Sequence, residues 1–394
     1  MSYEMVVPRK LNLELPIGKS AFLWGPRNCG KSTYLKEHFP RSLRLDFLRT
    51  DLFFEMSKRP GLLRERLLAQ EKTRLAHPIV LDEVQKIPEL LDEVHGLIED
   101  HRLSFILCGS SARKLKAGKA NLLGGRAWRY NLHPLCWAEL DASGYPMDLM
   151  TALTHGLVPT HYLEKEYRKS LQAYVYDYLK EEIMAEGLAR NVPAFSRFLD
   201  AVAFSHGEII NHSNIARDCG VDSKTVREYF QILSDTLVGH SVEPFAKSRG
   251  RDVILKAPKF YLFDVGIAGE LIKRRLELDR GAEFGKAFEH LILMELVAHR
   301  SYQNLEHSIR YWRTKSGLEV DFILGEGEVA LEVKGTSRVG PEELRALKAF
   351  QEDFKPRKSI LVCNEKEPRK AGAIEILPWK DFFRRLWGGE VVQG

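Results

Sequence analysis

The chain has 394 residues, more than one ordinary hydrophobic core accommodates, so two or three domains are expected. Its 44% hydrophobic and 29% charged residues are typical of a folded globular protein and exclude a collagen-like or wholly disordered chain. The net charge of +5 permits a nucleic-acid partner without requiring one, because binding depends on local basic patches.

The cysteines and the lack of long apolar runs predict a cytoplasmic protein. The five cysteines are scattered and form no CxxC pair, which is typical of a reducing compartment. The first residues lack the apolar segment of a secretory signal, and no apolar run approaches the roughly 20 residues that cross a membrane. We therefore expect no membrane partner.

In the first 150 residues, short apolar runs alternate with segments of helical periodicity. The expected strands are Ser20–Trp24, Leu43–Phe47, Pro78–Leu81 and Ser104–Cys108, and the expected helices are Leu62–Leu75 and Glu89–His101. Strands that alternate with helices indicate a parallel sheet with helices on both faces. Residues 1–150 are thus predicted to be an α/β domain of the P-loop NTPase type.

The first expected strand runs into a glycine-rich turn that opens a helix. The turn and the first helical residues fit the pattern G-x-x-x-x-G-K-[ST] and are Gly25, Pro26, Arg27, Asn28, Cys29, Gly30, Lys31, Ser32 and Thr33. Gly25 and Gly30 let the backbone amides approach an anion at the helix N-terminus. Lys31 would reach the β- and γ-phosphates of ATP, and Ser32 would give its hydroxyl to Mg²⁺. The segment therefore predicts an ATP–Mg²⁺ site.

A second apolar strand ends in the adjacent acids Asp82 and Glu83. Ligands of parallel sheets bind at the carboxyl ends of the strands. Asp82 is expected to hold Mg²⁺, and Glu83 to polarise the water that attacks the γ-phosphate. The alternative is that the two acids only cap the next helix.

A third strand, Ser104–Cys108, leads to further candidates for catalysis. Ser110 or Ser111 would sense the γ-phosphate, unless these residues form an ordinary turn. Arg113 and Arg126 are candidate arginine fingers, and the alternative for each is a surface arginine. The predicted catalytic set is Glu83, Lys31, Arg126, Arg113 and Ser110.

Residues 160–265 form the second predicted module, which is helical and winged-helix-like. Ser213, Gly220 and Ser223 would cap and turn a helix–turn–helix, and Leu237–Phe245 with Val253–Leu255 would form the hairpin of the wing. The basic residues expected to contact DNA are Lys224, Arg227, Lys247, Arg249 and Arg251. The alternative use of such a module is oligomerisation or closure of an ATPase.

Residues 266–394 form the third predicted module, which is α+β. In two strands joined by a Gly-Glu-Gly turn, Asp321, Glu332 and Lys334 project from one face. Asp321 and Glu332 would hold a second Mg²⁺ or a Mn²⁺, and Glu289 on a preceding helix would add an acid. The alternatives are charges on the solvent side of the sheet or a cross-strand salt bridge.

The order of these motifs resembles a bacterial and archaeal family of AAA+ ATPases fused to a C-terminal domain of unknown function that is similar to PD-(D/E)xK nucleases. The matching segments are Gly25–Thr33, Leu81–Gln85, Leu107–Ser111, Leu123–Arg126, Tyr178–Ile183, Pro258–Gly266, Gly285–Glu289, Tyr311–Thr314, Glu319–Asp321 and Glu332–Lys334. The resemblance implies nucleotide binding at the first set and a restriction-endonuclease-like fold at the last.

Two functions are compatible with this sequence. In the first, an ATPase couples hydrolysis to DNA that is bound by the wing and cut at the nuclease-like site. In the second, ATP controls a DNA- or protein-binding switch, with the nuclease-like domain as a scaffold. Either version admits a homo-oligomer, as ATPases of this kind form.

Overall fold

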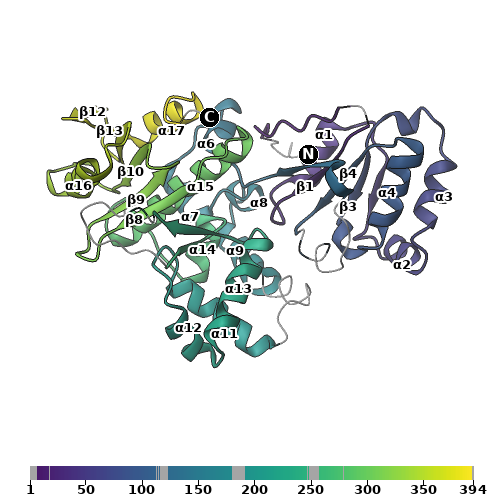
Figure 1. Ribbon diagram of the computed structural model, residues 1–394, viewed down its shortest axis with the longest axis horizontal. Coiled ribbons are helices and arrows are strands. Elements are labelled where there is room, and N and C mark those ends of the chain that lie inside the picture. Colours follow the sequence, from purple (N-terminus) through teal and green to yellow (C-terminus); the bar gives the residue numbers. More distant parts are fainter. Residues whose placement is uncertain are drawn as a thin grey trace. The chain divides into compact units, whose positions relative to one another are not determined.

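The computed structural model describes residues 7–16, 18–111, 113, 115, 123–179, 191–245, 247, 257–277 and 279–392. The chain folds into two compact units (Figure 1). The first unit is Leu11–His133 with Ile232–Val238, and the second unit is Met1–Lys10, Pro134–Gln231 and Gly239–Gly394. The finer limits 1–150, 160–265 and 266–394 stay predictions from the sequence.

The first unit is built on a five-stranded parallel sheet. Its strands are β1 Ser20–Trp24, β2 Arg44–Asp46, β3 Ile79–Asp82, β4 Phe105–Gly109 and β5 Ala127–Asn131, in the order β2-β3-β4-β1-β5. Both β1 and β4 are buried along their whole length, as expected for parallel strands covered on both faces. The predicted parallel α/β arrangement is confirmed.

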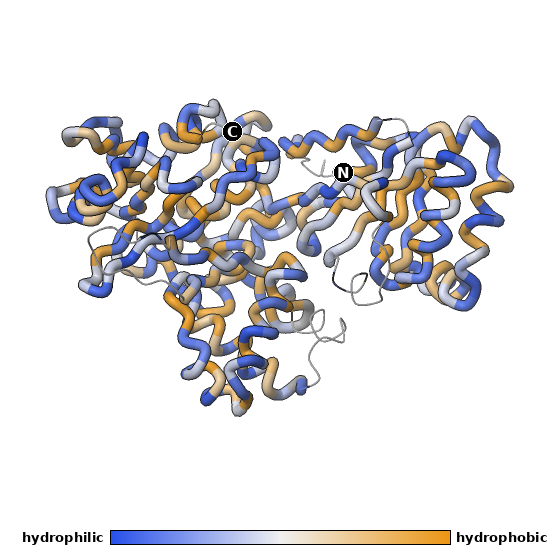
Figure 2. Tube along the Cα trace, in the orientation of Figure 1, coloured by the Kyte–Doolittle hydropathy of each residue, from blue (hydrophilic) through white to orange (hydrophobic). Residues whose placement is uncertain are grey.

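Helices α1 Lys31–His38, α2 Thr50–Lys58, α3 Leu62–Leu68 and α4 Leu90–His101 belong to this unit. Buried side chains from the strands and helices, including Phe22, Leu81 and Leu97, form one core, and strands β1, β3 and β4 are mainly hydrophobic (Figure 2). The single helix predicted over 62–75 is wrong, because α3 ends at Leu68 and a separate 3₁₀ turn follows at Arg74–Ala76. The polar residues between them offer no apolar face for packing.

The second unit contains the following described helices. They are α6 Trp137–Ala142, α7 Leu149–His155, α8 Pro159–Tyr162, α9 Tyr167–Ala173, the π-helix η4 Tyr174–Leu179, α11 Val192–Phe204, α12 His212–Cys219, α13 Ser223–Asp235, α14 Val265–Leu271, α15 Ala282–Tyr302, α16 Arg345–Phe354 and α17 Trp379–Trp387. The last residues of α13, from Ile232, count with the first unit.

A mixed eight-stranded sheet also lies in the second unit. Its strands are β6 Gly239–Pro244, β7 Lys259–Leu262, β8 Ile309–Arg313, β9 Glu319–Leu324, β10 Val329–Val333, β11 Lys358–Cys363, β12 Arg369–Ala371 and β13 Ile374–Pro378. The order is β12-β13-β11-β10-β9-β8-β6-β7. Helices α15 and α16 both pack against β10, which is buried along its whole length.

The helix–turn–helix forms, but its surroundings differ from the predicted wing. Gly220 has a left-handed φ of 68° between α12 and α13. Strand β6 does not stand alone in a wing hairpin, because it pairs with β7 and with β8 in the large sheet. The second predicted wing strand, 253–255, lies outside the described residues.

The predicted helix caps are wrong by one or two positions. The side chain of Asn211, rather than that of Ser213, accepts the amide of Asn214 at 3.1 Å. Asp222, rather than Ser223, accepts the amide of Thr225 at 2.7 Å. In each case the acceptor stands three residues before the donor, which is the geometry of an N-cap.

Buried Glu295 on α15 makes the stability of the second unit depend on pH. It accepts hydrogen bonds from the Trp137 amide at 2.6 Å and from Trp387 Nε1 at 3.0 Å. Burial raises the pKa of Glu295 to about 8, against the two donated hydrogen bonds. The folded state therefore holds a proton that the unfolded state has released, and stability falls as pH rises from about 4.5 to about 8.

Replacing Glu295 by glutamine is expected to remove this pH dependence. Between pH 5.5 and 8.5, the wild-type free energy of unfolding should drop relative to that of Glu295→Gln by on the order of 2–4 kcal/mol. Urea denaturation at the two pH values measures the difference. The control is Glu306→Gln, whose carboxylate is exposed; parallel profiles for wild type and Glu295→Gln would contradict the assignment.

Candidate functional site

The turn between β1 and α1 has the backbone of a phosphate-binding loop. Gly30 and Asn28 have left-handed φ values of 93° and 61°. A Cβ at Gly25 would lie 2.4 Å from the carbonyl oxygen of Leu132, so only glycine fits there. Helix α1 begins at Lys31 without a side-chain cap, which leaves its N-terminus available to an anion.

Lys31 is buried inside this loop. Its Nζ donates to the carbonyl oxygens of Gly25 at 2.7 Å and Pro26 at 3.0 Å. Two neutral carbonyls accept two of the three hydrogen bonds that the ammonium group can donate, but they do not neutralise its charge. The lysine is thus held at the loop, where a phosphate oxygen would be a stronger, charged acceptor.

Ser32 and Asp82 meet at the same edge of the sheet. Ser32 Oγ donates to Asp82 Oδ2 at 2.8 Å, although their positions differ by 50 residues. The other carboxylate oxygen, Asp82 Oδ1, accepts the amide of Glu83 at 3.1 Å. A hydroxyl beside a carboxylate supplies the hard oxygen ligands that Mg²⁺ prefers, so these residues fit the ion.

Glu83 is buried in a strained backbone position with φ of 58°. Gln85 Nε2 donates to Glu83 Oε2 at 2.6 Å and to Ser110 Oγ at 3.1 Å. Burial raises the pKa of Glu83, while the charges of Lys31 and Arg27 act in the opposite direction. The helix-cap interpretation of Glu83 is wrong, because its side chain makes no capping hydrogen bond to the 3₁₀ turn that follows.

Gln85 is a site residue that the sequence analysis missed. Its Oε1 is buried and has no hydrogen-bond partner among the described residues. A Cβ at Gly109 would lie 2.0 Å from that oxygen, so the glycine at the end of β4 makes room for the amide. The sequence did contain a signal for this role. Gln85 follows the two acids closely, and a glycine immediately precedes Ser110.

Of the two serines considered as sensors, Ser110 joins the Glu83 network and Ser111 does not. Ser111 Oγ lies 3.5 Å from the carbonyl oxygen of Asp235 and accepts the amide of Arg113 at 3.0 Å. The guanidinium of Arg113 forms an ion pair with the Asp235 carboxylate. Arg113 therefore follows the carboxyl end of β4, on the same edge of the sheet as the phosphate loop, but its charge is paired with Asp235.

Arg126 lies at the opposite edge of the sheet from the phosphate loop. Its carbonyl accepts the amide of Ser20 at 3.1 Å, at the start of β1, and its guanidinium pairs with Glu99 of α4. The five residues of β1 span roughly 16 Å. The structure therefore does not bring Arg126 to Lys31 within one chain, because β1 separates them.

The second unit contains a buried acidic cluster where the nuclease-like site was predicted. The pairing of Leu331 with Phe322 and of Ala330 with Ile323 places Glu332 across from Asp321. Asp321 Oδ2 accepts the amide of Val333 at 2.7 Å, and Lys334 Nζ lies 2.6 Å from Glu332 Oε1. Both acids are buried, so the alternative that they face solvent is wrong.

The charges in this cluster perturb one another. Burial raises the pKa of Asp321 well above its ordinary value, and the charge of Glu332 raises it further. Burial also raises the pKa of Glu332 to about 7, against the attraction of Lys334. Glu332 Oε2 is buried without a hydrogen-bond partner in the described part of the chain.

Lys259 and Tyr261 of β7 are cluster residues that the sequence analysis did not assign. Lys259 Nζ is 3.4 Å from Glu289 Oε1 and pairs with Glu319, and the Tyr261 hydroxyl donates to Glu289. Glu289 is thus already bound by a cation and a phenol. Among the described residues, no three or more His, Cys, Asp or Glu side chains converge as a metal site.

The described residues that were predicted to contact DNA do not form one basic patch. Lys224 and Arg227 are exposed on α13, beside exposed Asp222 and Glu228. Lys247 Nζ pairs with Glu326 at 2.7 Å. The other two predicted contacts, Arg249 and Arg251, lie outside the described residues.

Across the residues that the structure covers, no helix has both the length and the hydrophobicity to cross a membrane.

Three family models match the chain in succession: an AAA domain over residues 18–141, and two domains of unknown function over 147–278 and 284–382. Each covers less than half of the chain, so they describe segments rather than the whole protein.

Two similar proteins are uncharacterized proteins of Mycobacterium bovis and Mycobacterium tuberculosis, each 26% identical over 285 residues. The match covers 68% of this chain and 63% of the length of each relative. A solved structure, the Aeropyrum pernix ORC1 protein in complex with DNA, matches 66% of this chain and 87% of its own, at 14% identity and a TM-score of 0.31. A likeness this low supports no inference here. Residues 18–141 are similar to an AAA domain, and the described strands within them form one parallel sheet.

Proposed function

We propose that the first unit binds ATP with Mg²⁺ and hydrolyses it. The observation that carries this proposal is the convergence of Lys31, Ser32, Asp82 and Glu83 at the carboxyl edge of one parallel sheet. A cation, a hydroxyl and two carboxylates in this arrangement are the groups that phosphoryl transfer requires.

Each residue has a defined task in this mechanism. The amides at the start of α1 and the ammonium of Lys31 bind the phosphates, and Lys31 exchanges two loop carbonyls for charged oxygens. Ser32 and Asp82 would hold Mg²⁺, which when bound neutralises charge on the phosphates. Glu83 accepts a hydrogen bond from the attacking water, and Gln85 orients Glu83 toward it. Ser110, which shares Gln85, reports the γ-phosphate to the same network.

Replacing Lys31 by alanine tests this function. We expect ATP affinity in the presence of Mg²⁺ to fall about 10- to 100-fold, because a charge-assisted hydrogen bond to phosphate is lost. Isothermal titration calorimetry on the full chain measures it, with Lys36→Ala, on the exposed face of the same helix, as control. If wild-type protein gives no heat with ATP and Mg²⁺, the proposal fails.

Arg126 has a role in this proposal only through a second copy of the chain. Since β1 separates it from its own phosphate loop, it would act as a finger in a neighbouring subunit of a homo-oligomer. Arg113 is the candidate within the chain, and it would first have to leave Asp235. A cytoplasmic location fits such an ATPase.

A second candidate function is metal-dependent cleavage of DNA at Asp321, Glu332 and Lys334. Glu332 Oε2, which has no hydrogen-bond partner among the described residues, belongs to the residue opposite Asp321 in the neighbouring strand, and this favours it. Two carboxylates fit a Mg²⁺ or Mn²⁺ ion if water or phosphate completes the shell, and Lys334 would offset charge on the phosphate. The winged-helix interpretation, with Lys224, Arg227 and Lys247 on DNA, belongs to this proposal. The opposing proposal is an ATP-controlled switch with a non-catalytic cluster.

A further inference from the structure

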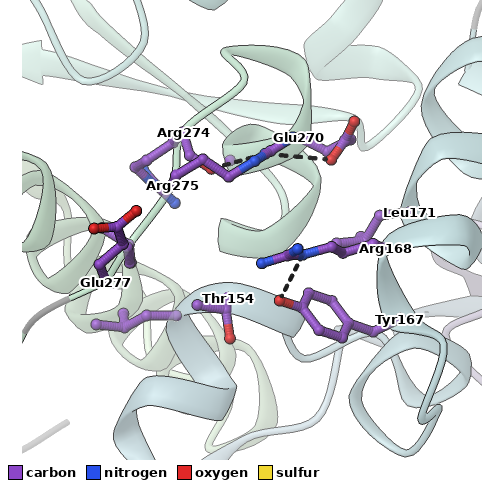
Figure 3. Close-up of a pocket in the computed structure, with 11 residues that line it drawn as sticks. Thr154, Tyr167, Arg168, Leu171, Glu270, Arg274, Arg275 and Glu277 are labelled. Carbon is purple, nitrogen blue, oxygen red and sulfur yellow. Dashed lines mark hydrogen bonds and ion pairs between the residues drawn. The ribbon is translucent and has the colours of Figure 1, made fainter.

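A small cavity in the second unit lies between α7, α9, α14 and the segment that follows α14 (Figure 3). Its volume is about 90 Å³. A water molecule takes up about 30 Å³ of the liquid, so the cavity holds about three waters or one group of that size. The polar residues that line it are Thr154, Tyr167, Arg168, Glu270, Arg274, Arg275 and Glu277.

Arg274 is a buried cation in the wall of this cavity, with 9% of its surface exposed. Its Nη2 donates to the carbonyl oxygen of Val265 at 2.9 Å, but its Nη1 finds no acceptor within the described chain. A Cβ at Gly269 would lie 3.1 Å from Nη2, so the glycine leaves space for the guanidinium. Burial lowers the pKa of Arg274 to about 10, although Glu283 and Asp264 oppose the shift. A buried charged group with an unsatisfied hydrogen-bond donor destabilises the folded state unless an acceptor binds to it.

Two further guanidinium groups reach the same space. Arg168 Nε donates to the Tyr167 hydroxyl at 3.2 Å, and the guanidinium points into the space framed by Thr154, Arg274 and Arg275 (Figure 3). Arg275 Nη1 lies 3.8 Å from Glu270 Oε2, a loose ion pair. Three arginines and two carboxylates, those of Glu270 and Glu277, line the cavity, and the charges of Glu283 and Asp264 also act on Arg274.

We propose that this cavity binds a single phosphate group, through Arg168 and Arg274. A phosphate presents oxygens in several directions, so guanidinium groups from opposite walls can each donate to it. A carboxylate of similar size has only two oxygens in one plane. The phosphate belongs either to a free anion or to the end of a nucleic-acid strand, and the chemistry of recognition is the same for both. This site is separate from the phosphate loop and does not depend on ATP hydrolysis.

The test uses the full chain carrying Lys31→Ala, which weakens the phosphate loop as a competing site. Calorimetry at low ionic strength titrates it with inorganic phosphate, and in a second arm with a short 5′-phosphorylated oligonucleotide and its 5′-hydroxyl counterpart. Adding Arg168→Ala should weaken binding at least about tenfold, because a charge-assisted contact is lost. The matched control is Lys169→Ala, an exposed cation next in sequence that does not line the cavity.

Binding of inorganic phosphate identifies a free anion as the ligand, and binding only of the 5′-phosphorylated strand identifies a nucleic-acid end. Binding in neither arm overturns the proposal. Equal losses in Arg168→Ala and Lys169→Ala also overturn it, since they would reflect diffuse surface charge. Arg274→Lys should likewise weaken binding by removing the fork of donors. Arg168 is exposed, so its variant should fold even where the Arg274 variant does not.

Discussion

Replacing Glu83 by glutamine is expected to leave ATP bound while its hydrolysis slows by about 10²- to 10⁴-fold. Glutamine keeps the shape of the side chain and can still accept the hydrogen bond from Gln85. It cannot take a proton from water, so only the chemical step is lost. Measured kcat should therefore fall, while ATP affinity from calorimetry stays within a few-fold of wild type.

The pH dependence of hydrolysis gives an independent check on Glu83. Burial raises the pKa of this carboxyl, and the residue must be ionised to act as a base. The rate should thus decline with falling pH earlier than an exposed carboxylate would dictate. Exposed Glu89→Gln is the matched control and should keep normal turnover. Normal turnover in Glu83→Gln would remove this residue from the proposed mechanism.

Alanine at Glu332 or at Lys334 is expected to abolish any Mg²⁺- or Mn²⁺-dependent cleavage of DNA by the wild-type chain. Glu332 supplies a metal ligand in the proposal, and Lys334, 2.6 Å from it, supplies the positive charge beside it. Gel assays with single- and double-stranded DNA, with and without ATP, measure cleavage, and parallel ATPase rates show whether DNA stimulates hydrolysis.

The control for these variants is Glu328→Ala, an exposed acid that lies next to β10. It should cut DNA as wild type does. If the wild-type chain cuts no DNA with either metal, the nuclease proposal is wrong and the switch is favoured. Cleavage that survives in Glu332→Ala would place the reaction elsewhere in the chain.

The phosphate loop was predictable because its functional residues are close together in the sequence. Gly25, Gly30 and Lys31 act through spacing along the backbone, which the sequence displays directly. The parallel sheet and the acids at the end of β3 followed from the alternation of strands and helices. Gln85 was missed because its contact to Ser110 depends on two strands lying side by side.

The acidic cluster was only partly predictable. The alternation of the two strands placed Asp321 and Glu332 on one face, and the register agrees. Their burial did not follow, because it depends on how helices cover the sheet. Lys259 was not assigned because it lies 60 residues before Glu319 in the chain. The order of strands in the sheet brings β7 to the cluster, and the periodicity of the sequence does not reveal that order. Arg126 was assigned by motif alone, without regard to which end of its strand it occupies.

The unmatched oxygen of Glu332 bears on the thermodynamics of the fold. A buried carboxylate whose second oxygen finds no donor in the described chain destabilises the native state, and replacing Glu332 together with its partner Lys334 by well-packed apolar residues would often be neutral or stabilising. Under the proposal that Glu332 binds a metal ion, this oxygen is a ligand position that the chain keeps at the cost of thermal stability.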